Sequence, residues 1–154
     1  MEGRCTCGAV CYRMTRGPLF VHACHCTWCQ RETGPAFALN AMIEAGFVAL
    51  MAGQPEEVVT PSASGRGQIV LRCPTCKVAL YSHYAGAGRK VAFVRVGTLD
   101  APSACPPDIH IFTATKLDWV ALDDRVPVVS EYYDRKVMWP DWALARRAVM
   151  LAKG

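Results

Sequence analysis

The chain has 154 residues, 52% of them hydrophobic and 19% charged, with a formal net charge of +4. This composition is typical of an ordered globular protein and excludes an intrinsically disordered one. The length suits one domain with its own core, so we predict a single domain over residues 1–154.

The charge and the first residues limit the partners and the location. The formal charge of +4 is only mildly basic, and no basic run is longer than two residues. We therefore expect no nucleic-acid partner. The start lacks a basic segment followed by an apolar one, and Asn40 and Glu44 interrupt the most apolar window, residues 36–53. We expect a cytoplasmic protein without a membrane span.

Short apolar or alternating runs dominate the chain and predict β-strands separated by turns. The predicted strands cover residues 9–14, 19–24, 36–42, 56–60, 68–73, 78–84, 90–99, 109–115 and 126–133. One helix is predicted over residues 139–153, where Pro140 suits the first turn and Trp142, Ala145 and Val149 share one face. The fold class is therefore mainly β with a C-terminal helix.

The chain holds nine cysteines, and seven of them lie in closely spaced groups. In a reducing compartment such spacing favours metal ligands or redox pairs over disulfides. Cys5 and Cys7 form a C-x-C pair whose side chains point the same way in an extended segment. Cys73 and Cys76 form a C-x-x-C knuckle. Four cysteines of this kind predict a closed, structural zinc site.

Cys24, Cys26 and Cys29 lie within six residues, and no further cysteine is near them in sequence. Three protein ligands with one exchangeable position are typical of catalytic zinc, so we predict a second, reactive zinc here. His25 would point to the opposite side of an extended segment and support the site without ligating. The expected cofactors are two Zn²⁺ ions per chain.

Spacing alone leaves alternatives open. Cys5 and Cys7 could instead share one ion with two cysteines of the middle group. Either C-x-x-C could be a redox pair, although neither has the strand-then-helix setting of a thioredoxin motif. Cys11 and Cys105 stand apart, and we interpret them as small hydrophobic residues without a functional role.

Six segments in chain order resemble the glutathione-dependent formaldehyde-activating enzyme family, which shares its domain with centromere protein V. They are CTCGAVCY, CHCTWCQRETG, SGRGQIVLRCPTC, VALYSHY, VRVGTLDAPS and HIFTATKLDWVALDDRVPVVSEYY. The resemblance runs from about residue 3 to about residue 133. It implies a β-tent of antiparallel sheets with a zinc-ribbon-like centre. It also assigns Cys5, Cys7, Cys73 and Cys76 to a structural zinc and Cys24, Cys26 and Cys29 to the active-site zinc.

The resemblance implies a carbon–sulfur lyase or synthase that joins glutathione and formaldehyde, or a related aldehyde, into S-hydroxymethylglutathione. Five residues are candidate contacts for the glutathione carboxylates and amine: Gln30, Arg31, Thr33, His110 and Lys116. Gly34, Trp28 and Trp119 are instead interpreted as turn and core residues. The alternative function is a non-catalytic zinc module that binds a thiol compound or a macromolecule. The edges of the sheets would permit a homodimer.

The chain departs from the family pattern at the knuckle. Lys77 follows Cys76 where family members usually have glycine. Since a knuckle often needs a positive φ at that position, lysine implies strain or a different turn. The segment KLDW stands where a lysine-x-proline-tryptophan pattern is common.

Overall fold

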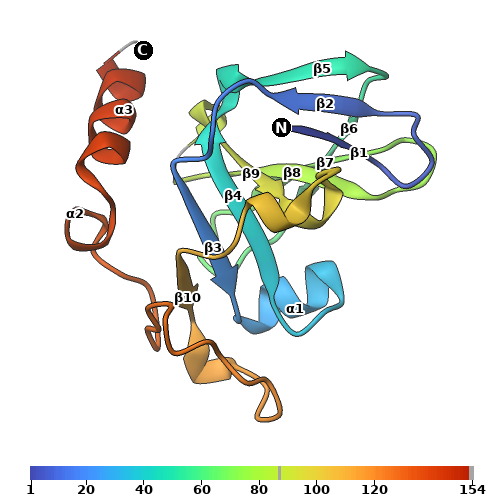
Figure 1. Cartoon of the computed structure of the whole chain (residues 1–154). Coiled ribbons are helices and arrows are strands. Elements are labelled where there is room, and N and C mark those ends of the chain that lie inside the picture. Colours follow the sequence, from blue (N-terminus) through green and yellow to red (C-terminus); the bar gives the residue numbers. More distant parts are fainter. Residues whose placement is uncertain (87, 153–154) are drawn as a thin grey trace.

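The computed structural model describes residues 1–86 and 88–152, and it consists of two sheets with short helices (Figure 1). The smaller sheet has the order β1-β2-β5, and all its neighbours are antiparallel. Its strands are β1 (Glu2–Arg4), β2 (Cys11–Met14) and β5 (Val48–Ala52). Among the described helices, none is long and apolar enough to cross a membrane.

The larger sheet has seven strands in the order β10-β3-β4-β9-β8-β7-β6. They are β3 (Phe20–Cys24), β4 (Ala38–Glu44), β6 (Glu56–Thr60), β7 (Gln68–Arg72), β8 (Ala79–Tyr84), β9 (Val91–Arg95) and β10 (Ile109–Ile111). The expected antiparallel pairing holds for every neighbour except β10, which pairs with β3 in parallel. A parallel strand requires a long crossover, and residues 96–108 provide it between β9 and β10.

The described helices are short apart from the last. The α-helices are α1 (Thr27–Thr33), α2 (Arg135–Met138) and α3 (Asp141–Ala152). The 3₁₀ helices are η1 (Ala45–Phe47), η2 (Gly88–Lys90), η3 (Val96–Thr98), η4 (Pro102–Ala104) and η5 (Thr113–Thr115). The mainly β fold with a C-terminal helix is thus confirmed. The predicted helix extends to Lys153, which lies outside the described residues.

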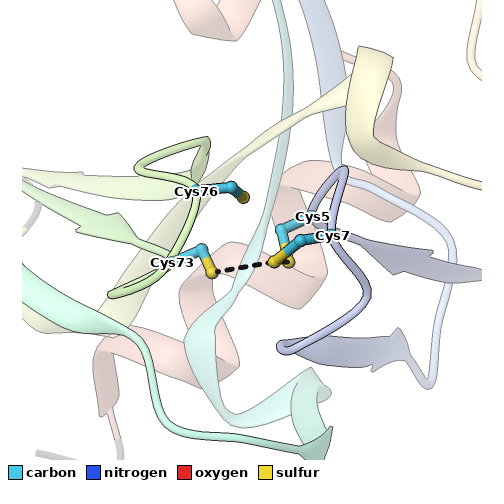
Figure 2. A group of neighbouring side chains, drawn as sticks. All are labelled: Cys5, Cys7, Cys73 and Cys76. Carbon is cyan, nitrogen blue, oxygen red and sulfur yellow. Dashed lines mark hydrogen bonds between the residues drawn. The ribbon is translucent and has the colours of Figure 1, made fainter.

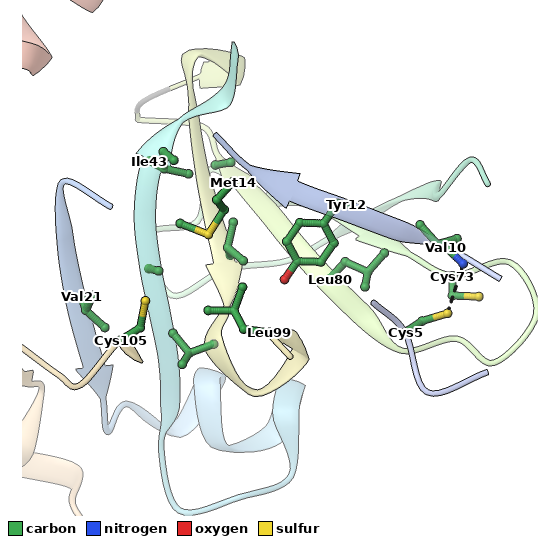
Figure 3. Packing of buried hydrophobic residues seen from close by; sticks show 14 residues of the cluster. Cys5, Val10, Tyr12, Met14, Val21, Ile43, Cys73, Leu80, Leu99 and Cys105 are labelled. Carbon is green, nitrogen blue, oxygen red and sulfur yellow. Dashed lines mark hydrogen bonds between the residues drawn. The ribbon is translucent and has the colours of Figure 1, made fainter. Parts of the chain in front are cut away.

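A first core fills the space between the two sheets (Figure 3). Tyr12 and Met14 of β2 pack there with Ile43 of β4 and Leu80 of β8. A second core covers the opposite face of the larger sheet, where Phe20 of β3 meets the C-terminal segment. Because both of its faces are covered, β3 is buried along its whole length, as a continuous apolar run predicts.

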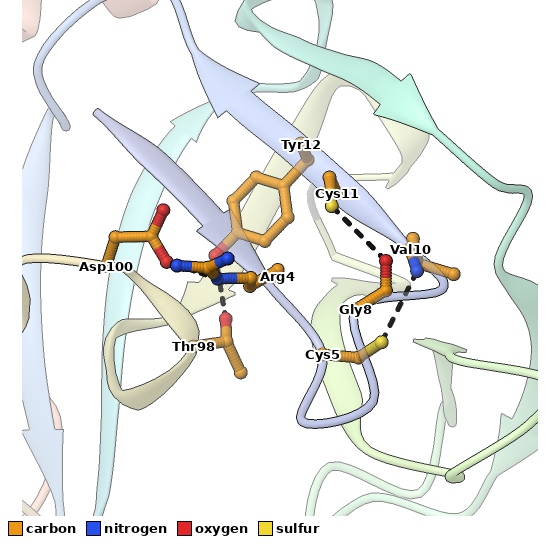
Figure 4. Close-up of polar contacts among 8 residues, drawn as sticks. All are labelled: Arg4, Cys5, Gly8, Val10, Cys11, Tyr12, Thr98 and Asp100. Atoms are coloured by element: carbon orange, nitrogen blue, oxygen red, sulfur yellow. Dashed lines mark hydrogen bonds and ion pairs between the residues drawn. The ribbon is translucent and has the colours of Figure 1, made fainter.

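The β1–β2 hairpin is tied to the segment after β9 (Figure 4). The Tyr12 hydroxyl lies 2.7 Å from Oγ1 of Thr98, and Arg4 forms an ion pair with Asp100 at 2.9 Å. Gly3 allows this arrangement, because a Cβ there would lie 2.5 Å from Cζ of the Tyr12 ring. The hairpin therefore holds its turn, residues 5–10, against the larger sheet.

A predicted strand and the predicted packing face of the C-terminal helix are wrong. Residues 126–133 form no strand; Val128 makes only an isolated bridge to His110. Pro127 lacks a backbone N–H, so a regular ladder cannot pass through this segment. The helix face with Trp142, Ala145 and Val149 is exposed, and α3 instead packs through Ala143 on the second core.

Candidate metal centres

Both cysteine groups lie at one end of the larger sheet. Because neighbouring strands run in opposite directions, β3 and β7 end at the edge where β4 and β8 begin. Cys24 is the last residue of β3, and Cys73 directly follows β7. The sheet therefore sets the positions of the first sulfur of the middle group and of the knuckle.

The four-cysteine cluster consists of Cys5, Cys7, Cys73 and Cys76, whose sulfurs all lie within 4.8 Å of one another (Figure 2). The Cys7 sulfur lies 3.5 Å from that of Cys5 and 3.7 Å from that of Cys73. Four sulfurs that each lie about 2.3 Å from one Zn²⁺ are roughly 3.8 Å apart in a regular tetrahedron. All four cysteines are free thiols. The donor set and its spacing fit a closed zinc site.

Backbone amides support thiolates in this cluster. The Val10 N–H donates to the Cys5 sulfur at 3.3 Å (Figure 4). The Val78 N–H, followed by weaker donors, lowers the pKa of Cys76 to about 6. Such donors favour the deprotonated sulfur that a metal needs.

Lys77 adopts the left-handed conformation that the knuckle requires, with φ of 61°. Its N–H donates to the Cys73 carbonyl at 3.0 Å, which closes the knuckle. Arg72 donates to the Lys77 carbonyl at 3.1 Å, and the Lys77 ammonium pairs with Glu56 at 2.8 Å. Of the two expected outcomes, strain at lysine is therefore the one that the structure has.

The three-cysteine cluster consists of Cys24, Cys26 and Cys29, whose sulfurs also lie within 4.8 Å of one another. After Cys24 the chain turns into a helix, in which Cys26 is the N-cap of α1 and Cys29 lies in the first turn. The helix ends at Gly34, whose φ of 87° and N–H bond to the Gln30 carbonyl form a C-terminal cap. Gly34 therefore has the turn role that was expected of it.

The three sulfurs share negative charge unequally. Thiols of Cys24 and Cys29 that donate to the Cys26 sulfur lower the pKa of Cys26, and the Cys29 N–H contributes. The Cys24 sulfur lies 3.5 Å from that of Cys26 and is the donor, so the pKa of Cys24 is raised. A cation bound among them would favour thiolates at all three positions.

Among the described residues, no fourth Cys, His, Asp or Glu joins the three-cysteine cluster. His25 turns away from it: its Nε2 lies 2.9 Å from Nδ1 of His110, and its side chain is fully buried. Burial, with the nearby His110, lowers the pKa of His25 to about 4 and keeps the ring neutral. The protein thus offers three sulfur ligands to one side of the strand end and a histidine pair to the other.

The five candidate substrate contacts are mostly engaged within the protein. Gln30 donates to the backbone carbonyls of His25 and Thr115, at 2.7 and 3.0 Å. Thr33 donates to the Cys29 carbonyl at 2.7 Å, and Lys116 donates to the carbonyls of Leu117 and Val120.

His110 is 6% exposed, and Arg31 lies exposed in the last turn of α1. A role of these five residues in substrate binding stays a prediction. The two tryptophans were wrongly expected in the core, since Trp28 and Trp119 are 43% and 76% exposed.

The structure adds a buried cation that the sequence analysis missed. Arg95, the last residue of β9, lies opposite Asn40 of β4 and donates a hydrogen bond to its side-chain oxygen. The pKa of Cys29 is raised to about 11: the Cys24 thiol and, more weakly, the Arg95 charge lower it, but Cys26 and burial together raise it by more. An arginine inside the apolar run of residues 90–99 was the available signal, because a charge in a buried strand needs a partner.

Three comparisons relate the chain to known proteins. The family model described as "Glutathione-dependent formaldehyde-activating enzyme" matches residues 1–115. A Halomonas elongata protein named "Putative glutathione-dependent formaldehyde-activating enzyme" is 24% identical over 130 residues, which cover 81% of this chain and 82% of the relative. A crystal structure of a Rhodobacter sphaeroides protein has 18% identity and a TM-score of 0.50 over 84% of this chain and 100% of its own. This last likeness concerns the fold alone.

Proposed function

The chain belongs to the glutathione-dependent formaldehyde-activating enzyme family, and from this premise we propose that it is a zinc-dependent carbon–sulfur lyase. Its reaction joins glutathione and formaldehyde, or a related aldehyde, into S-hydroxymethylglutathione, or runs in reverse. The family match and the relative's name support the two reactants. The cysteine geometry supports the metal.

One observation carries the proposal. Cys24, Cys26 and Cys29 bring three sulfurs within 4.8 Å, and the described residues offer no fourth Cys, His, Asp or Glu ligand. A zinc held by these residues would supply a position for the glutathione thiol and favour its thiolate form. The three cysteines favour delivery of a glutathione thiolate over activation of the aldehyde. Three thiolates outweigh the charge of the ion, so the ion polarises an aldehyde poorly.

The reaction needs no redox partner. The glutathione sulfur forms a bond to the aldehyde carbon, the carbonyl π bond breaks, and the proton lost by the thiol ends on the oxygen. A thiol with a pKa of about 8.5 is roughly 3% ionised at pH 7, so full ionisation gives at most about 30-fold, or roughly 2 kcal/mol. A larger acceleration must come from residues that hold the two reactants together.

The first test compares rates with and without protein. At saturating glutathione, stopped-flow measurement should show adduct formation faster than the spontaneous reaction, and zinc analysis should give about two ions per chain. Equal rates would reject the enzymatic role, and one ion per chain would reject the separate reactive site.

The second test separates the reactive site from a structural one. Cys26→Ser should return the rate to background while the melting temperature stays within a few degrees, because the four-cysteine cluster keeps its metal. A non-catalytic module would instead lose several kcal/mol of stability with the same change. Calorimetry on the purified zinc protein distinguishes the two.

A further inference from the structure

A cavity of about 690 Å³ lies at the sheet end that carries both cysteine clusters. Its wall includes Glu32 and Thr33 of α1, Ala38 at the start of β4, and the terminal residues Arg72 and Arg95 of β7 and β9. Small-molecule sites typically have volumes of about 300–1,000 Å³, so the cavity can hold a ligand of tripeptide size.

Arg95 is a buried cation of this wall without a carboxylate partner. It is 7% exposed, its guanidinium donates a hydrogen bond to the neutral side chain of Asn40, and its Nε has no hydrogen-bond partner. The ion pairs found among the described residues do not include Arg95. The other arginine of the wall, Arg72, is already paired with Glu32 at 2.5 Å. A buried guanidinium without an anion is unfavourable, so the site is suited to an anion from outside.

The cavity wall and the three-cysteine cluster are built from the same elements. The Thr33 hydroxyl donates to the carbonyl of Cys29 on the same helix at 2.7 Å. Ala38 is the register partner of Cys24. A ligand in the cavity therefore lies next to the strand end and helix that hold the sulfurs.

We propose that this cavity binds a carboxylate of the small peptide thiol and that Arg95 is the residue that anchors it. The inference rests on the proposed function, because it names the part of the same substrate that lies away from the sulfur. A planar guanidinium matches a carboxylate in shape and charge, and a buried pair excludes thiols that lack the acid group.

The test uses S-methylglutathione, which keeps both carboxylates but has no free thiol to ligate a metal. Isothermal titration calorimetry on the zinc-loaded chain should show binding, and the diethyl ester of the same compound should bind at least 10-fold more weakly. Arg95→Gln should weaken binding of the acid by at least 10-fold but leave binding of the ester unchanged. Arg16→Gln, at an exposed arginine that does not line the cavity, is the matched control and should bind the acid normally.

A second pair of variants guards against misfolding at the buried arginine. Ser103 lies exposed on the cavity wall, and its neighbour Ala104 is exposed but does not line the cavity. Ser103→Trp should block S-methylglutathione binding, whereas Ala104→Trp should not.

The outcomes separate this inference from the proposed function. Binding that depends on Arg95 and Ser103 in a protein without turnover would uphold the cavity and reject the lyase. Normal binding of the acid by both Arg95→Gln and Ser103→Trp would overturn the inference whatever the activity. Loss of zinc from Arg95→Gln with unchanged affinity for the acid would also overturn it, since the cysteine sulfurs would then be the counter-charge of Arg95.

Discussion

At the residue scale, Lys77 shows what a motif can and cannot predict. The C-x-x-C spacing locates a knuckle, and the missing glycine marks the next residue as a place of strain or altered turn. The structure has the strained form, with φ of 61°. Sequence alone could not choose between the two, because the contacts around Lys77, such as the Arg72 bond to its carbonyl, form only in the folded chain.

His22 of β3 gives the fold a dependence on pH. It is 3% exposed, its Nε2 lies 2.5 Å from the Tyr133 hydroxyl, and burial, aided by Arg135, lowers its pKa to about 3. Below about pH 6.5 the unfolded chain binds a proton at this residue that the folded chain does not. Stability from the neutral ring is therefore full above pH 6.5 and falls by up to about 1.4 kcal/mol per pH unit as the pH drops toward 3.

Urea denaturation at pH 7, 6 and 5 measures this slope. His22→Gln should lose that part of the slope while other protonation effects, including those of the cysteines, remain common to both proteins. Identical slopes in the two proteins would show that His22 is not the responsible group.

At the element scale, one ion pair holds α3 against the sheet. Arg146 of α3 contacts Glu44, the last residue of β4, through two bonds of 3.0 and 2.6 Å, and Glu44 is 8% exposed. Arg146→Met should lower the free energy of unfolding by about 1–3 kcal/mol, because it leaves a buried carboxylate without a partner. Hydrogen exchange in α3 should rise with it.

The control for this pair is Arg147→Met, because Arg147 is the neighbouring arginine and forms no ion pair among the described residues. The double variant Arg146→Met, Glu44→Gln should recover part of the loss. If the double variant is as unstable as the sum of its parts, the contact is not what holds the helix.

The elements that the sequence predicted best are runs of strand-forming residues with a turn at their ends. Strands β6 and β7 follow the expected ranges closely, because each contains β-branched residues and a turn with Gly65 and Gly67 separates them. Strand β1 was missed because it has only three residues, and β5 because its place in a sheet comes from its pairing with β2. The buried face of α3 was wrong because Ala143, Leu144 and Met150 meet the second core, and the face with Trp142 and Val149 does not.

The sequence likewise predicted one part of the candidate site and missed another. Cysteine spacing and family resemblance name the two groups of sulfurs that the fold brings together. The environment of Arg95 could not be predicted, because Asn40 becomes its neighbour only through the register of β4 and β9. The spacing of residues along the chain predicts local groups of metal ligands, whereas a cavity between strands depends on pairing between residues far apart in sequence.

At the scale of the whole molecule, the four-cysteine cluster joins the two sheets. Cys5 and Cys7 come from the turn after β1 of the smaller sheet, and Cys73 and Cys76 from the turn between β7 and β8 of the larger one. Cys73→Ser should reduce the zinc content by about one ion and destabilise the fold by several kcal/mol, because the first core depends on this contact. Thermal unfolding and zinc analysis measure both effects.

The matched control is Cys11→Ser, a cysteine of β2 that belongs to neither cluster and lies against Gly8 at the surface. It should keep its full zinc content and melt close to the parent protein. A Cys73→Ser protein with unchanged zinc and stability would show that the sheets are held together by the core alone.

The two halves of the four-cysteine cluster lie far apart along the chain, so the ribosome synthesises them at different times. Cys73 follows Cys7 by 66 residues, so a ribosome that adds 5–20 residues per second makes it roughly 3–13 s later. The middle three cysteines are complete well before then. A nascent chain therefore contains the complete three-cysteine cluster before the four-cysteine cluster, and Cys5 and Cys7 remain without Cys73 and Cys76 during that interval.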